Sequence, residues 1–161
     1  LRPSFERLTR AGVTNCEVIS AQDKGKLEAS GPFDCVVIDA PCSGSGSWRR
    51  KPDAKWRLTQ KQFAQRLKDQ AQVLEKGFEL TKPGGTILYI TCSVLPEENA
   101  DQVAAMLNRH KDLALVPYKQ VWERGIGGIA PHSADGAENT LLLTPASHDT
   151  DGFFVAVMQR V

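Results

Sequence analysis

Two cysteines in this chain stand where a thiol can act as a nucleophile. Cys42 lies in the segment DAPCSGSG (39–46), and Cys92 lies in the segment YITCS (89–93). The thiolate form of cysteine attacks electron-poor carbon atoms and forms covalent intermediates. A single cysteine at a strand end is commonly a small buried hydrophobic residue. Two such cysteines, both followed by serine and one closely preceded by Asp39, favour covalent chemistry instead.

Short apolar runs without polar alternation precede both cysteines, CVVI (35–38) and ILYI (87–90). Such runs are typical of strands covered on both faces of a parallel sheet. Because a helix-length segment separates them, we expect a strand–helix–strand crossover with parallel strands. The carboxyl ends of parallel strands meet at one edge, where open α/β folds bind ligands. The sequence therefore predicts that both thiols share one pocket.

Other elements are expected along the chain. A helix starts after Thr59, with Gln62 as its capping-box partner, and another starts near Pro96, where Glu97 and Glu98 favour its positive end. A further helix is expected over 1–11, strands over 16–21, 33–39 and 86–92, one weak strand within 113–122, and a loop over 125–139. Two strands over 141–144 and 153–158 are expected to form an antiparallel hairpin at the sheet edge.

The composition is that of a globular domain. The 161 residues are 41% hydrophobic and 24% charged, enough for one domain with a buried core. No apolar run approaches membrane-spanning length, no secretory signal opens the chain, and the four cysteines show no metal-type pair. We therefore expect a cytoplasmic protein with reduced thiols, no metal and no membrane partner. Cys16 and Cys35 lie in predicted strands and are expected to be core residues.

The net charge is only +1, but cations gather after the Cys42 loop. Six of them stand against one acid, Asp53, within residues 49–61, and Trp48 and Trp56 lie among them. The six are Arg49, Arg50, Lys51, Lys55, Arg57 and Lys61. Cations neutralise phosphates and flat rings stack on bases, so the stretch is either a nucleic-acid surface or a solvated loop anchored by its tryptophans.

Together these motifs give a specific resemblance. The chain resembles the catalytic domain of RNA cytosine-5 methyltransferases of the Sun/Fmu type. The matching motifs lie, in order, within residues 33–46, 49–56, 80–85, 89–93, 95–99 and 151–156. The similarity covers most of residues 16–158. It implies a Rossmann-like α/β fold that depends on S-adenosylmethionine, with RNA as the substrate, ribosomal RNA first and transfer RNA second.

The resemblance also implies roles for individual residues. Cys92 would add to carbon 6 of a cytosine, carbon 5 would then take the methyl group, and Cys42 would assist the release of Cys92. Asp39 would hydrogen-bond the cytosine edge, and Asp23, Asp39 and Pro41 would belong to the cofactor site, with Asp23 meeting the adenine. The RNA would be held by Arg49, Arg50, Lys51 and Lys55.

Two family features have no counterpart here, the glycine-rich cofactor loop and the acid that holds the ribose. We therefore expect residues 1–161 to be a partial catalytic domain, truncated at the N-terminus, that binds the cofactor weakly and is inactive alone. The strand 16–21 would lack its two family neighbours. Since unpaired backbone groups need partners, we expect it to pair with 34–39 or with another chain, or to be poorly ordered before residue 30.

Two other functions remain open from the residues alone. A thiol hydrolase would pair Cys92 or Cys42 with His110, His132 or His148, although no motif surrounds these histidines. A catalytically idle RNA-binding module would keep only the basic stretch. The sequence does not indicate an oligomeric state.

Overall fold

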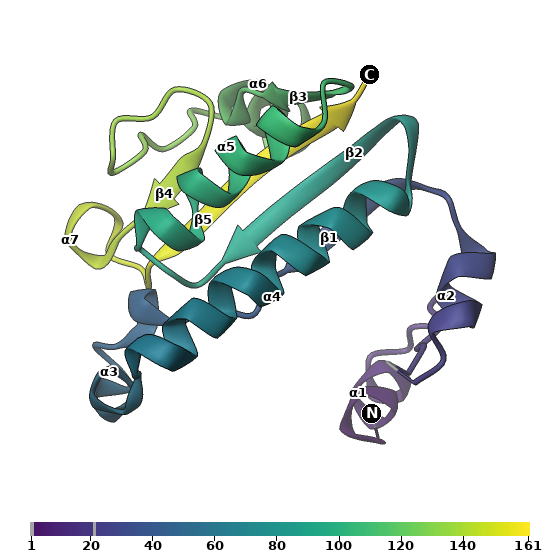
Figure 1. The fold of residues 1–161 in the computed structure, drawn as a ribbon, viewed down its shortest axis with the longest axis horizontal. Helices are drawn as coiled ribbons and strands as arrows, with labels where there is room; N and C mark the ends of the chain where they lie inside the picture. The colour runs from purple at the N-terminus through teal and green to yellow at the C-terminus, as the bar shows by residue number, and fades with distance from the viewer. Residues whose placement is uncertain (1, 21) are drawn as a thin grey trace. The chain divides into compact units, whose positions relative to one another are not determined.

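A five-stranded mixed sheet forms the centre of the larger of two units in the computed structural model, which describes residues 2–20 and 22–161 (Figure 1). The units are Leu1–Pro32 and Phe33–Val161. In the sheet, β1 (Phe33–Asp39) pairs in parallel with β2 (Thr81–Thr91). On the other side of β2 lies the antiparallel β5 (Phe153–Arg160), which also pairs with β3 (Leu113–Val116) and β4 (Leu141–Leu143).

The predicted crossover between the two cysteines is confirmed. Its main helix is α4 (Gln60–Glu79), preceded by a short 3-10 turn at Ser45–Ser47 and by α3 (Pro52–Arg57). The predicted capping box is present, because the Thr59 hydroxyl accepts from the Gln62 N–H and the Gln62 side chain accepts from the Thr59 N–H. These reciprocal bonds satisfy backbone donors that a helix start leaves free.

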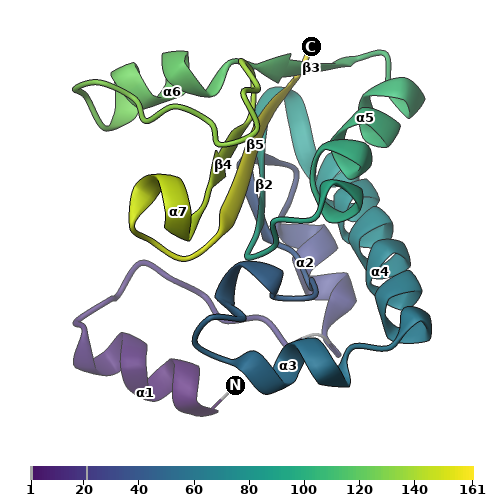
Figure 2. The same ribbon diagram turned by 90° about the vertical axis from the view of Figure 1, so that its left-hand side faces the viewer.

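Two helices cover one face of the sheet, α4 and α5 (Ala100–Arg109), and α6 (Tyr118–Gly125) lies on the opposite face (Figure 2). Ile87 and Tyr89 of β2 are fully buried, as alternate residues of a strand must be when they face one helix layer. The core is completed by residues of five further elements, among them Ile38, Leu74, Phe78, Val103, Met106, Leu113, Phe154, Ala156 and Met158.

Coverage of both faces was expected for the first strand, and that prediction is wrong. The side chain of Val37 is 60% exposed, and Cys35 is exposed rather than part of the core. Val36 and Ile38 lie against Gly77 of α4, whereas Cys35 and Val37, the alternate residues of the strand, point to the opposite face. Cys16 is likewise exposed, so neither cysteine is the core residue that was predicted.

The predicted strand over 16–21 is also wrong. Residues 13–20 form no strand, and residue 21 lies outside the described residues. The N-terminal unit instead has two helices in its described part, α1 (Arg2–Arg10) and α2 (Lys24–Ser30). Among the described residues, the strand that β1 pairs with is β2. A segment without a strand partner gains no ladder hydrogen bonds, so its apolar pattern alone does not make it a strand.

The predicted antiparallel pairing of the C-terminal hairpin is confirmed, but the predicted position of both strands at the sheet edge is wrong. β4 and β5 are antiparallel and are joined through the short helix α7 (Pro145–His148). β5 is an interior strand, because β2 lines one of its sides and β3 and β4 share the other. In the region 113–122, β3 is followed by α6. No helix in the described residues has the length and apolarity needed to cross a bilayer.

Candidate active site

The two sulfurs meet at one edge of the sheet, as the sequence predicts. Asp39 at the end of β1 pairs in register with Ile90 of β2, so the segments that follow both strands leave the sheet side by side. The Sγ atoms of Cys42 and Cys92 lie 3.3 Å apart. Both cysteines are free and half-buried, so a substrate atom can reach them.

This contact makes the two thiols unequal. A hydrogen bond from the Cys42 thiol lowers the pKa of Cys92 to about 7, against the opposing effects of burial and of the charges of Asp39 and Glu98. The same contact, together with burial, raises the pKa of Cys42. The main cause of the lowered pKa of Cys92 is thus the neighbouring thiol. Cys92 is therefore the thiol of the pair that ionises more readily.

A buried carboxylate holds the Cys42 loop in place. Glu98 is fully buried and accepts from the Ser43 N–H at 2.7 Å and from the Ser43 hydroxyl at 2.5 Å. Gln70 of α4 donates to Glu98 at 3.0 Å and to the Pro41 carbonyl at 2.9 Å. The residues on both sides of Cys42 are thus tied to the segment that follows Cys92.

The sequence placed Glu98 at a helix start and assigned no role to Gln70, so both members of this network were missed. Glu98 precedes α5 and turns toward Ser43 instead of serving the helix. Only its position in the matching motif at 95–99 signalled that it mattered.

Serines form a second tie between the loops. The hydroxyls of Ser45 and Ser93 lie 2.9 Å apart, and the Val94 N–H donates to Ser45 Oγ at 2.9 Å. Asn99 donates to the Ser93 carbonyl at 2.9 Å and accepts from Thr91 Oγ1 at 2.6 Å. Two independent networks therefore fix the separation of the cysteines.

The C-terminal motif enters the same site through two glycines. The Gly46 N–H donates to the Cys92 carbonyl at 3.0 Å, and the Gly152 N–H donates to the Gly46 carbonyl at 2.9 Å. A Cβ atom on Gly152 would lie 2.6 Å from Gly46 Cα, so side chains are excluded at this crossing. Asp151, next to it, accepts from Arg50 Nε at 3.1 Å and lies 4.0 Å from Arg49 Nη2.

The other predicted site residues have mixed positions. Asp39 is exposed at the rim and Pro41 is half-buried, both beside the cysteines. Lys55 lies over two aromatic rings, 6.0 Å from the Trp48 centroid and 5.5 Å from that of Trp56. The Trp56 side chain is 82% exposed, so it does not anchor the loop to the core.

Asp23 lies in the N-terminal unit, where it is the N-cap residue of α2. Its predicted contact with the adenine of the cofactor stays a prediction.

A pocket of about 380 Å³ opens directly beside Cys42 and Ser43. Three cations line it, Lys51, Arg57 and Arg66. Lys51 was predicted to hold RNA, Arg57 was named only as part of the basic stretch, and Arg66 was not predicted. The two arginines make exposed ion pairs, Arg57 with Asp53 at 3.0 Å and Arg66 with Asp69 at 3.6 Å. Exposed pairs of this kind are weak and exchange readily for another anion. The pocket is therefore suited to a phosphate next to the thiols.

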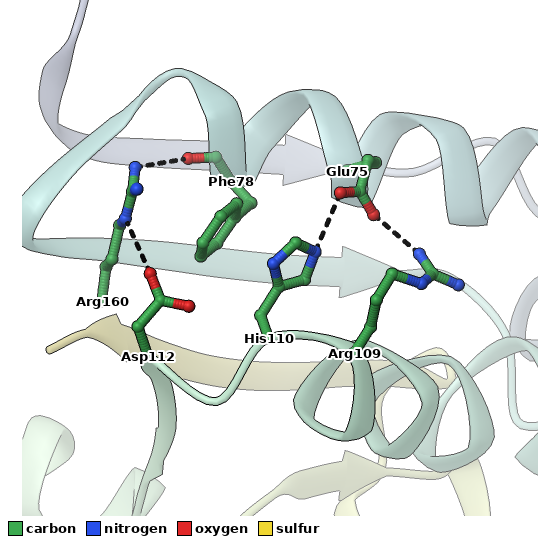
Figure 3. Close-up of polar contacts among 6 residues, drawn as sticks. All are labelled: Glu75, Phe78, Arg109, His110, Asp112 and Arg160. Atoms are coloured by element: carbon green, nitrogen blue, oxygen red, sulfur yellow. Dashed lines mark hydrogen bonds and ion pairs between the residues drawn. The ribbon is translucent and has the colours of Figure 1, made fainter.

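The histidines take part in other contacts. His110 Nε2 lies 2.8 Å from Glu75 Oε1, and its ring centroid lies 3.9 Å from that of Phe78 (Figure 3). His132 and His148 lie against each other, with ring centroids 4.8 Å apart. Among the described residues, no histidine hydrogen-bonds either thiol of the pair, so a cysteine hydrolase has no base here. The described residues also include no cluster of histidine, cysteine or acidic side chains that could hold a metal ion.

Comparisons with known proteins identify the family of this chain. A family model described as 16S rRNA methyltransferase RsmB/F matches residues 4–159. Curated relatives named ribosomal RNA small subunit methyltransferase B are 38% identical in Shewanella oneidensis and 41% identical in Salmonella newport, each over 77% of this chain. The chain spans about a quarter of their length, 26% and 25%.

Solved structures show the same fold. NSun6 from Pyrococcus horikoshii, determined with SFG, has a TM-score of 0.79 and 25% identity, covering 99% of this chain and 38% of its own. A methyltransferase homologue from the same organism has a TM-score of 0.75 and 30% identity, covering 99% of this chain and 50% of its own. The Rossmann-like methyltransferase fold expected from the sequence is thereby confirmed.

Proposed function

Because this chain belongs to the RsmB/F family of 16S rRNA methyltransferases, we propose that it forms part of an enzyme that methylates carbon 5 of a cytosine in ribosomal RNA. The family depends on S-adenosylmethionine, and SFG, bound in one structural neighbour, is an analogue of that cofactor. The observation that carries the proposal is the 3.3 Å contact between Cys42 and Cys92 at the carboxyl rim of β1 and β2.

The first step uses the thiolate of Cys92. Its pKa of about 7 leaves a large thiolate fraction at neutral pH, and half-burial keeps the sulfur accessible. The sulfur bonds to carbon 6 of the cytosine, and the electron pair of the 5,6 double bond moves toward carbon 5. We assign to Asp39, which is exposed at the rim, the hydrogen bond to the cytosine edge and the support of the charge that develops at the ring nitrogen.

S-adenosylmethionine, when bound, supplies the methyl group to carbon 5. The residues present fit part of its site, because the exposed carboxylate of Asp39 lies beside Pro41 at the rim and can accept hydrogen bonds from a cationic ligand. Asp23 is proposed to meet the adenine.

The last step uses Cys42. Its raised pKa depends first on the hydrogen bond to Cys92. Once Cys92 Sγ is bonded to carbon 6, it is no longer a thiolate, and this cause disappears. The pKa of Cys42 then falls, so Cys42 gives up its own proton to water more readily, and its thiolate can take the carbon 5 proton. Loss of that proton re-forms the double bond and expels Cys92.

RNA would be held by the cations beside the thiols. We assign this role to Arg49, Lys51 and Lys55, and we add Arg57 and Arg66 of the adjoining pocket. Arg50 is proposed to act together with Asp151, because its guanidinium is already bonded to that carboxylate. Extruding a base from its stack costs roughly a few kcal/mol, and the exposed ring of Trp56 is available to compensate by stacking.

The test is a covalent trap. RNA containing 5-fluorocytosine offers no proton at carbon 5, so the enzyme should stop as an adduct that peptide mapping places on Cys92. In the complete protein, the Cys92→Ala variant should form no adduct with this RNA. The Cys42→Ala variant should accumulate a stalled adduct even on ordinary RNA. RNA binding without an adduct in either experiment would favour the idle RNA-binding module instead.

A further inference from the structure

The sulfur pair has a chemistry that RNA methylation does not use. Two free thiols lie 3.3 Å apart, and a disulfide bond is about 2.05 Å long, so a small closing movement would join them. We propose that the Cys42–Cys92 pair is a site of oxidative modification, at which a peroxide converts both thiols into an intramolecular disulfide that reversibly blocks the nucleophile.

The reaction balances in two steps. The Cys92 thiolate attacks one oxygen of hydrogen peroxide, the O–O bond breaks, hydroxide leaves, and Cys92 becomes a sulfenic acid. The Cys42 sulfur then attacks the sulfenic sulfur, the S–O bond breaks, and water leaves with the proton of Cys42. Both cysteines are oxidised, one peroxide is reduced to two waters, and a dithiol reductant reverses the change.

The geometry assigns a different role to each sulfur. Cys92 is the thiol whose pKa is lowered, so it reacts first with an oxidant that attacks thiolates. Cys42 is held beside it by the Ser43–Glu98 bonds and therefore acts as the resolving thiol. Fast closure of the disulfide would keep Cys92 from the irreversible sulfinic and sulfonic states.

The other two cysteines provide an internal comparison. Cys16 and Cys35 are exposed, and no other thiol contacts either one among the described residues. Exposure alone would make them the first thiols to be oxidised, whereas proximity favours the half-buried pair for a disulfide. Intracellular disulfides are commonly transient or redox-sensing, which suits a bond formed at a catalytic centre.

The experiment needs no RNA, so its outcome does not depend on the proposed methylation. The complete protein, and a matched Cys35→Ser variant, are treated with hydrogen peroxide, alkylated and mapped by mass spectrometry without reduction. We expect a peptide linked between Cys42 and Cys92 in both proteins, with loss of alkylation at both positions and full recovery after dithiothreitol. In Cys42→Ser, Cys92 should instead progress to the sulfinic or sulfonic acid and should not recover.

Any other state of the pair in the wild-type protein overturns the proposal. Cys92 that stays alkylatable, or that carries a sulfinic group while Cys42 remains free, would show that the sulfurs do not close on each other.

Discussion

Glu98 accepts hydrogen bonds from both the backbone N–H and the hydroxyl of Ser43, and so joins the loop after β1 to the segment after β2. The two residues are 55 positions apart in the sequence. Ser43 directly follows Cys42, and Glu98 belongs to the segment that follows Cys92. Because the carboxylate is fully buried, its bonds are protected from competition by water. The position of Cys42 relative to Cys92 therefore depends on Glu98, although Glu98 forms no hydrogen bond with either sulfur.

Removal of this carboxylate should destabilise the protein. In Glu98→Ala, the Ser43 N–H and the Gln70 amide lose their buried acceptor, and unfolding free energy should fall by about 1–3 kcal/mol. Urea titration of the complete protein measures the change. Glu97→Ala is the matched control, because Glu97 is exposed and its loss should stay within about 0.5 kcal/mol. Equal effects of the two substitutions would contradict the role of Glu98.

The low pKa of Cys92 should depend on Cys42. In Cys42→Ala the hydrogen-bond donor is gone, so the pKa of Cys92 should rise from about 7 toward the ordinary thiol value of about 8.5. The pH dependence of the Cys92 alkylation rate reports this value. Cys42→Ser keeps a hydroxyl donor and should show a smaller rise. If the alkylation profile of Cys42→Ala matched the wild type, the proposed cause of the shift would be wrong.

The pocket cations should bind RNA through its phosphates. Arg57→Gln and Arg66→Gln should each weaken binding to all sequences alike and reduce the slope of log K against log salt concentration by about 1. Lys119→Gln removes the same charge from α6, outside the pocket, and should leave the slope unchanged. Binding titrations at several salt concentrations measure this slope for each variant. If all three variants lowered the slope equally, the effect would come from net charge alone and not from the pocket.

Acid should reduce the stability that Glu75 contributes through its ion pairs with Arg109 and His110, which lie away from the cysteines. Arg109 and His110 hold the pKa of Glu75 below its ordinary value, although burial opposes them (Figure 3). A lowered pKa in the folded state contributes stability above the unfolded value of about 4.3, and this contribution is lost as the pH falls through the folded value. Glu75→Gln should therefore be less stable than wild type at pH 7, and the difference should begin to shrink as the pH falls below about 4.3.

Thermal unfolding across this pH range tests the prediction. Glu123→Gln, an exposed change on α6, is the control and should run parallel to wild type at every pH. A constant gap between Glu75→Gln and wild type down to pH 3 would be the contrary result.

The sequence alone determined the crossover and its consequence for the cysteines. Two short apolar runs separated by a helix-length segment leave a right-handed parallel crossover as the main arrangement, and parallel strands bring their carboxyl ends together. The contact between Cys42 and Cys92 follows from this local pattern, and so does the capping box of Thr59 and Gln62.

Only the tertiary structure decided which groups complete the site and which strands exist. Glu98, Gln70 and Gly152 reach the cysteine loops from segments distant in sequence, and no periodicity reports such contacts. The segment 16–21 has an apolar strand pattern, yet residues 13–20 form no strand, and Cys35 lies exposed on an edge strand. The physical reason is the same in each case: a strand or a buried carboxylate is stable only with partners for its polar groups, and the fold supplies those partners.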